Sequence, residues 1–310
     1  MKLKKLAKVL LVSTLAVGLL TGCSSGSKDD KTIKVGASPT PHAEILEAAK
    51  PLLEKEGYKL EVSTYDDYVL PNDALADGSL DANYFQHIPY LEETVKEKGY
   101  DLTYCAKVHI EPMGIYSNSI KKLDEVKDGD KVAVPNDSTN EARALKLLAK
   151  QGLIEVKDGE LITVKDITKN PKNLKFVEVD AAQVPSTLDD VAIAVINTNY
   201  ALNVGLNPTK DALAIESSDS PYVNIVAIRT EEKDSDKIKA LTKALNSDEV
   251  KKFIEEKYNG TISIFSRLIY FQISVSVQLE IGNTRMLSPF LILELYNFHI
   301  SGLWFFGSHA

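Results

Sequence analysis

An arginine lies close to the predicted start of a helix within residues 134–143. Ser138 and Glu141 have the S-x-x-E spacing of a capping box, which predicts that the helix begins just after Ser138. Arg143 then lies in or next to the first turn, where the helix dipole disfavours a cation. The placement is explained if the site receives an anion such as a carboxylate. The alternative is a solvated surface arginine.

Polar and aromatic residues follow several predicted strands, and ligands in parallel α/β folds bind beyond the carboxyl ends of strands. These residues are Ser38, Tyr65, Phe85, His87, Asn140, Arg143 and Asn197. A free amino acid offers a carboxylate for Arg143, and an ammonium for the amide oxygens of Asn197 and Asn224. Aromatic rings would line an apolar slot, for which the candidates are Tyr65, Tyr68, Phe85 and Tyr116. A thioether gains from such rings without being selected by them, and each ring could instead belong to the core.

Motifs of the common enzyme classes are missing from the sequence. It contains no G-x-S-x-G elbow, no phosphate-binding loop and no H-E-x-x-H helix. His42, His87 and His109 lack metal-ligand spacing with any cysteine or carboxylate cluster, and we interpret them as structural or surface residues. We expect no catalysis, no cofactor and no metal.

Strands and helices alternate through the body, which predicts an α/β protein with parallel sheets. Residues 32–37, a helix ended by Gly57 and residues 58–64 form a βαβ unit. Two closing helices are predicted within residues 235–257. Further strands are predicted at 79–83, 101–110, 131–134, 174–179, 191–196 and 222–229, and a helix at 181–188.

The N-terminus reads as a lipoprotein signal, residues 1–22, with a basic start and a short apolar segment. Thr21-Gly22-Cys23 fits a lipobox, so Cys23 would be diacylated and followed by a tether to residue 31. The alternative is an ordinary signal peptide with a chance cysteine. Without the four signal-peptide lysines the net charge of −8 becomes roughly −12, which argues against nucleic acid. Only Cys105 remains, so no disulfide framework is available.

Residues 261–310 differ from the body because they contain no lysine and carry most of the phenylalanines and the only tryptophan, Trp304. Their apolar runs do not make a convincing membrane span. We interpret the segment as non-native, from a frameshift or read-through. The alternative is a membrane-associating or docking tail.

Five blocks of sequence resemble the signature segments of the MetQ/NlpA family, the methionine-binding lipoproteins of ABC importers. The blocks are residues 68–72, 81–87, 132–137, 189–200 and 220–224. The resemblance runs from the lipobox to about Gly260. It implies a two-lobed type II periplasmic binding protein fold whose chain crosses between lobes near 110–114 and near 222–224. Lobe 1 would comprise 32–112 plus 224–260, and lobe 2 would comprise 113–223.

The resemblance also implies the site. Arg143 would bind the carboxylate, and Asn197 and Asn224 would anchor the zwitterion. Tyr68, Phe85 and His87 would surround the side chain, with Tyr65, Tyr116 and Asn140 as further candidates. The expected ligand is L-methionine, and the expected partners are an ABC permease with its ATPase and, through the lipid, the outer face of the cell membrane. Two alternatives stay open: D-methionine, a methionine derivative or a methionine dipeptide in the same role, or an adhesion lipoprotein without transport.

Overall fold

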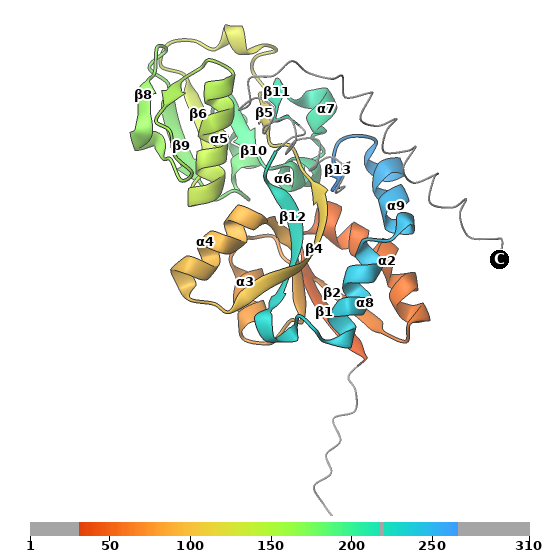
Figure 1. Cartoon of the computed structure of the whole chain (residues 1–310). Coiled ribbons are helices and arrows are strands. Elements are labelled where there is room, and N and C mark those ends of the chain that lie inside the picture. The colour runs from red at the N-terminus through yellow and green to blue at the C-terminus, as the bar shows by residue number, and fades with distance from the viewer. Residues whose placement is uncertain (1–30, 218–219, 266–310) are drawn as a thin grey trace, which may run out of the picture. The chain divides into compact units, whose positions relative to one another are not determined.

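The computed structural model describes residues 31–217 and 220–265 (Figure 1). The predicted signal peptide, Cys23 and all but the first few residues of the atypical tail lie outside the described residues. Nearly all described elements belong to one unit, which ends at Ser263. Within the described ranges no helix has the length and apolarity needed to cross a membrane.

The first sheet has six strands in the order β13-β4-β12-β3-β1-β2. β1, next to the edge strand β2, pairs in parallel with β2 and β3, and Thr32 lies opposite Lys59 in the first of these ladders. The predicted βαβ unit is therefore confirmed. β12 runs antiparallel to both β3 and β4. The strands are β1 (Thr32–Ala37), β2 (Lys59–Thr64), β3 (Ala82–His87), β4 (Leu102–Ile110), β12 (Val223–Arg229) and β13 (Ser263–Ile264).

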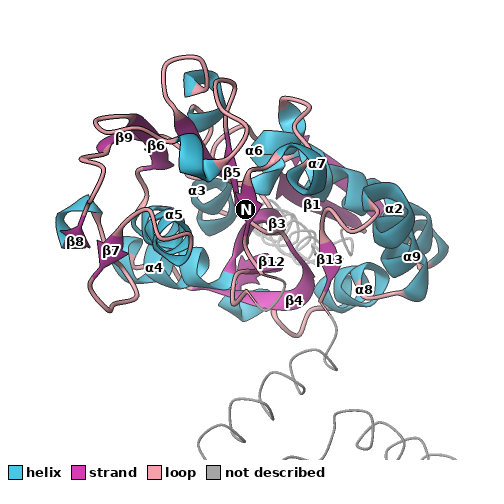
Figure 2. Ribbon diagram, turned by 90° about the horizontal axis from the view of Figure 1, so that it is seen from above, coloured by secondary structure: helices cyan, strands magenta, loops and turns pink. Residues whose placement is uncertain are grey.

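Helices with one apolar face accompany this sheet. Ile45, Leu46, Ala49 and Leu53 of α2 recur at helical spacing and are all buried. α2 packs against α8 and α9, the two predicted closing helices (Figure 2). The helical segments are η1 (Pro39–Ala43), α2 (Glu44–Lys55), α3 (Leu70–Ala76), α4 (Ile88–Lys98), η5 (Thr230–Glu232), α8 (Asp236–Leu245) and α9 (Asp248–Tyr258).

The second sheet has five strands in the order β11-β5-β10-β6-β9. β6 pairs in parallel with β9 and β10, and β5 runs antiparallel to β10 and β11. The strands are β5 (Gly114–Tyr116), β6 (Lys131–Pro135), β9 (Lys175–Val179), β10 (Ile193–Ile196) and β11 (Ala214–Ile215). The remaining elements are η2 (Leu123–Glu125), α5 (Ser138–Lys150), β7 (Glu155–Val156), η3 (Val164–Asp166), β8 (Ile167–Lys169), η4 (Val184–Thr187), α6 (Thr198–Asn203) and α7 (Pro208–Asp211).

The chain passes between the two sheets twice. It leaves the first sheet after Ile110 and returns to it at Val223, and these two residues pair in the β4–β12 ladder. The long strands β4 and β12 lie side by side along this ladder (Figure 1). The predicted lobe boundaries, 32–112 with 224–260 and 113–223, stay a proposal that these passages support.

Three local predictions were wrong. Tyr84 to His87 lie within β3 itself rather than after a strand at 79–83, because β3 is a central strand buried on both faces. Only a 3-10 turn, Val184–Thr187, forms where a helix was predicted at 181–188. The cap of α5 is Asp137, whose carboxylate accepts the N–H of Asn140 at 2.9 Å. Glu141 instead accepts the N–H of Val164 at 2.8 Å.

Buried amides connect β3 to α3. Asn83 Nδ2 donates to Asn72 Oδ1 at 2.8 Å and to the Pro71 carbonyl at 3.0 Å, while Gln86 Nε2 donates to Asn72 Oδ1 at 2.7 Å. Gln86 Nε2 also reaches Asn83 Oδ1 at 2.8 Å. The side chains of a central strand are polar here because they satisfy one another. The network fixes the start of α3 next to Tyr68.

Replacing Asn83 by alanine is expected to lower the free energy of unfolding by about 1–3 kcal/mol, because Asn72 and the Pro71 carbonyl lose buried partners. Urea unfolding followed by circular dichroism measures the change. Asn203→Ala, at an exposed position of α6, is the matched control and should change stability far less. Equal stabilities of the two variants would contradict the role of the network.

Candidate functional site

A narrow cavity lies where β3, α4 and the first passage meet α5 and α6. Its lining combines aromatic, amide and charged side chains from elements of both sheets. The lining residues are Tyr68, Phe85, Gln86, His87, Tyr90, Glu111, Asn140, Arg143, Asn197, Thr198, Asn199 and Asn224. Sequence positions more than a hundred residues apart therefore share one wall.

The orientation of the Asn197 amide follows from a chain of hydrogen bonds that starts at Asp137. The Asp137 carboxylate accepts from Asn140 Nδ2 at 3.0 and 3.1 Å, so Asn140 Oδ1 faces His87 and Asn197. Asn140 Oδ1 accepts from Asn197 Nδ2 at 2.8 Å. Asn197 Oδ1 is then left buried with no partner among the described residues. The site thus presents an unfilled acceptor.

His87 takes part in the same chain as a neutral imidazole. Its Nδ1 accepts the backbone N–H of Tyr90 at 3.2 Å, so its proton lies on Nε2, which faces Asn140 Oδ1 at 3.1 Å. Burial, reinforced by the charge of Arg143, lowers the pKa of His87 to about 3. His87 therefore donates one fixed hydrogen bond at neutral pH.

Arg143 is buried and paired within the protein. Its Nε donates to both carboxylate oxygens of Glu216 at 2.9 and 3.0 Å, and its Nη2 to the Glu111 carbonyl at 2.6 Å. Its guanidinium carbon lies 4.3 Å from the centre of the Tyr222 ring. Burial opposes the charge, but the ion pair with Glu216 outweighs it and raises the pKa of Arg143. Nη1 has no hydrogen-bond partner among the described residues, so one donor stays available.

Asn224 presents a donor to the cavity. Its Oδ1 lies 3.0 Å from His42 Nε2, and the same nitrogen lies 3.3 Å from a Glu111 carboxylate oxygen. A nitrogen between two oxygens must carry the proton, so Asn224 Oδ1 accepts and Nδ2 is turned away from His42. No partner for Nδ2 lies within the described residues. This differs from the acceptor role that the sequence suggested for Asn224.

Stacked rings form the other wall of the site. The centre of the Tyr68 ring lies 5.7 Å from that of Phe85 and 4.9 Å from that of Tyr200. Tyr68 Oη donates to Asn199 Oδ1 at 2.6 Å and links residues near the first sheet to α6. Tyr90 Oη donates to the Tyr68 carbonyl at 3.0 Å. Burial raises the pKa of Tyr68, so this wall stays uncharged and suits an apolar side chain.

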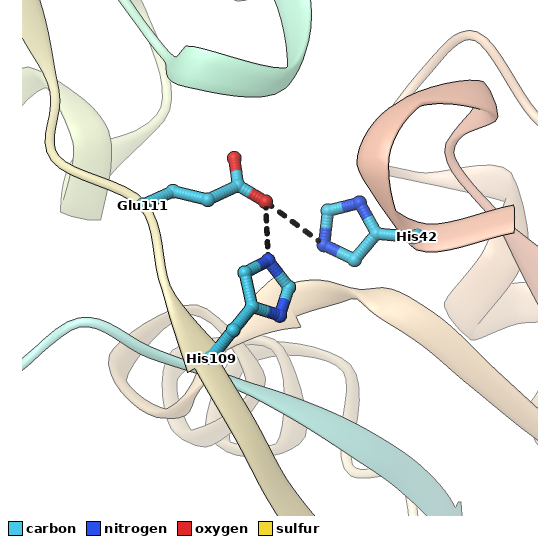
Figure 3. A group of neighbouring side chains, drawn as sticks. All are labelled: His42, His109 and Glu111. Atoms are coloured by element: carbon cyan, nitrogen blue, oxygen red, sulfur yellow. Dashed lines mark hydrogen bonds and ion pairs between the residues drawn. The ribbon is translucent and has the colours of Figure 1, made fainter. Parts of the chain in front are cut away.

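His42 and His109 meet Glu111, which itself lines the cavity (Figure 3). Their ligand-type atoms lie within 4.8 Å of one another, and two histidines with a glutamate are a donor set that zinc accepts. Both histidines, however, direct Nε2 at the same Glu111 oxygen, at 2.7 Å from His109 and 3.3 Å from His42. Donors that converge on one acceptor form a hydrogen-bonded triad, and we interpret the group in that way. Sequence spacing gave no sign of it because the residues come from separate elements.

The cavity lining includes most residues that the sequence suggested. Tyr68, Phe85, His87, Asn140, Arg143, Asn197 and Asn224 all line it. Tyr65 packs instead against the cluster around Leu75 and Leu80. Tyr116 lies in the core cluster of the second sheet, where its hydroxyl is buried without a partner. Their roles as ligand residues stay predictions.

Five lining residues were not singled out as site residues from the sequence: Gln86, Tyr90, Glu111, Thr198 and Asn199. Glu111 lies inside the segment predicted as the first crossing, and Thr198 and Asn199 follow Asn197 directly. Proximity to the predicted crossing and strand end was the signal that could have found them.

Comparison with known proteins gives consistent matches along the described body. The family model described as NlpA lipoprotein matches residues 33–264. The D-methionine-binding lipoprotein MetQ of Salmonella typhi is 47% identical over 265 residues, which cover 84% of this chain and 97% of that protein. The methionine-binding lipoprotein MetQ of Bacillus subtilis is 46% identical over 80% of this chain and 92% of its own length.

A solved structure of similar fold is that of a nutrient binding protein from Burkholderia cenocepacia bound to methionine. It superposes with a TM-score of 0.74 at 48% identity and covers 76% of this chain and 100% of that one. The predicted α/β fold, a two-lobed type II periplasmic binding protein with a two-segment hinge, is confirmed. With the match extending over most of its length, the chain belongs to the NlpA lipoprotein family.

Proposed function

We propose that this protein is a lipid-anchored, extracytoplasmic substrate-binding protein that captures L-methionine between its two lobes and delivers it to an ABC permease. It performs no catalysis. Ligand binding in the cleft stabilises the closed form, in which the two lobes come together around the ligand. The permease with its ATPase recognises that closed form. The family membership and the names of the relatives support the role.

One observation carries the proposal: the side chains of Asn197, Arg143 and Asn224, which keep an acceptor or donor without a partner among the described residues, line the same cavity as the aromatic rings. Asn197 Oδ1 can accept from an ammonium, while Arg143 Nη1 and Asn224 Nδ2 can donate to a carboxylate. Tyr68 and Phe85 supply an apolar surface on which a thioether gains about 0.3–1.5 kcal/mol per ring contact. A zwitterion with one apolar side chain matches these three features.

D-methionine and small methionine derivatives keep the same groups and are the alternative ligands. Relatives named for D-methionine and for methionine support both stereoisomers as candidates.

The lipid anchor rests on Cys23 and its lipobox, together with membership of a lipoprotein family. Diacylation of Cys23 would hold the folded body at the outer face of the cell membrane through the tether that ends at residue 31. The ABC permease and ATPase are the partners that the transport role requires.

Calorimetric titration of the purified protein with L-methionine tests the function, after unfolding and refolding to remove bound ligand. We expect one-to-one binding that Asn197→Ala weakens by about 1–3 kcal/mol, because the ammonium loses an acceptor. Asn203→Ala, on the exposed side of α6, is the control and should bind like the wild type. A binding signal with D-methionine or short methionine peptides but not with L-methionine would show that the ligand is one of these compounds instead. The absence of binding to all of them would support the adhesion alternative.

A further inference from the structure

Glu111 contributes the one carboxylate among the described residues that line the cavity. It is 5% exposed and follows β4 at the start of the first passage between the sheets. A buried carboxylate without a cation partner is costly unless donors surround it. The surroundings of Glu111 therefore indicate what the carboxylate is for.

Three donor groups surround the Glu111 carboxylate and oppose the effect of burial, which raises its pKa. His109 Nδ1 lies 2.5 Å from Tyr84 Oη, which has no other hydrogen-bond partner among the described residues and so donates to it. The remaining proton of His109 is then on Nε2, which donates to Glu111 at 2.7 Å. The backbone N–H of Asn199 donates to the same carboxylate, and His42 Nε2, which hydrogen-bonds Asn224 Oδ1 at 3.0 Å, lies 3.3 Å from it.

The charge of Glu111 is not balanced inside the protein. Burial lowers the pKa of His42 to about 4 and that of His109 to about 3, so both are neutral near pH 7. Arg143 reaches the Glu111 carbonyl rather than the carboxylate, and its own charge is paired with Glu216. An ionised Glu111 therefore has no cation of its own within hydrogen-bond distance among the described residues, and burial raises its pKa. A cationic group on the ligand would stabilise the ionised carboxylate.

The free acceptor positions of Glu111 and its location in the same cavity as Asn197 are both consistent with binding a cationic group of the ligand. Two carboxylate oxygens offer about four acceptor positions, and His109, the Asn199 N–H and the nearby His42 nitrogen use at most three of them, which leaves room for one more. Asn197, whose Oδ1 is a buried acceptor without a partner among the described residues, lines the same cavity. An ammonium has three N–H donors and would use both.

We propose that Glu111 binds the ammonium of the ligand, and that His42 and His109 are positioning residues that orient its carboxylate. The inference rests on the proposed function and specifies it: the site selects ligands with a free amino group and rejects those without one. His42 has a second task, because the same Nε2–H group fixes Asn224 with Nδ2 toward the ligand. The triad thus sets the donor and acceptor polarity of the cavity.

The test compares two ligands that differ only in the amino group, L-methionine and 4-(methylthio)butanoic acid, by calorimetric titration. In Glu111→Gln the preference for methionine over the analogue is expected to fall about 10- to 100-fold relative to the wild type. The control, Glu249→Gln on the exposed face of α9, should keep the wild-type preference. A merely structural role would weaken both ligands alike and leave their ratio unchanged.

A second pair of variants keeps the inference testable if Glu111→Gln does not fold. His42→Leu removes the donor to Glu111 and should reduce the preference for methionine, whereas His42→Gln keeps an N–H donor and should retain most of it. An unchanged ratio in Glu111→Gln or in His42→Leu overturns the inference while methionine binding by the wild type still stands. If the wild type binds neither compound, the proposed function and the inference are both overturned.

Discussion

Arg143→Ala is expected to lower the free energy of unfolding by about 3–5 kcal/mol and to abolish measurable methionine binding. The guanidinium is 3% exposed and pairs with Glu216 through Nε and Nη2. Removal leaves Glu216, which also accepts the Met113 N–H at 2.9 Å, without its cation. Thermal and urea unfolding measure the first effect, and calorimetry measures the second.

A double variant separates the two roles of Arg143. In Arg143→Ala with Glu216→Gln the unpaired carboxylate is gone, so part of the lost stability should return. Methionine binding should not return, because Nη1 is the group that we propose for the ligand carboxylate. Recovered binding in the double variant would show that Arg143 acts only through the fold. Arg143→Lys keeps the charge but not the planar fork, and intermediate stability is expected.

Acidification from pH 6.5 to 5 is expected to destabilise the protein by about 3–5 kcal/mol. Burial lowers the pKa of His42 to about 4 and those of His87 and His109 to about 3, against about 6.5 in an unfolded chain. Between these values the unfolded state binds protons that the folded state does not. Stability is therefore fully present above pH 6.5 and is lost as the pH falls, by about 1.4 kcal/mol per pH unit for each histidine.

Buried carboxyl groups oppose part of this loss. Burial raises the pKa of Glu111 and of Asp137, so these groups bind protons in the folded state and reduce the slope. Urea unfolding at a series of pH values measures the curve. His87→Gln should reduce its slope by about one proton, because a glutamine does not titrate. A flat curve between pH 6.5 and 5 would contradict the neutral, buried state of the three histidines.

The spacing of apolar residues, together with the turn and capping residues at the ends of strands and helices, predicted much of the fold. The β1–α2–β2 unit, the apolar strand β10 and the closing helices α8 and α9 all appear where apolar spacing placed them. The predictions failed where a local rule met a stronger competitor. Asp137, rather than Ser138, is the N-cap residue of α5. Tyr84 to His87 belong to β3 because that strand pairs with neighbouring strands on both sides.

The sequence predicted which residues line the candidate site, but not which of their atoms act as hydrogen-bond donors or acceptors toward a ligand. Residue types and strand ends pointed to Arg143, Asn140 and Asn197, yet sequence carries no information on which amide atom faces a ligand. That choice depends on partners distant in sequence, such as His42 for Asn224 and Asn140 for Asn197. Glu216 was missed for the same reason, because a surface-type glutamate becomes a partner of Arg143 only after the second sheet has formed.

The pairing of Ile110 with Val223 has a mechanical consequence. Both passages between the lobes start from neighbouring points of one hydrogen-bonded ladder, so they cannot bend independently of each other. We therefore expect opening to be a rotation about a single axis across the β4–β12 ribbon rather than free motion of one lobe. Because few orientations exist to be lost, closing over a ligand costs little conformational entropy. Small contacts in the cleft can then decide between the open and closed forms.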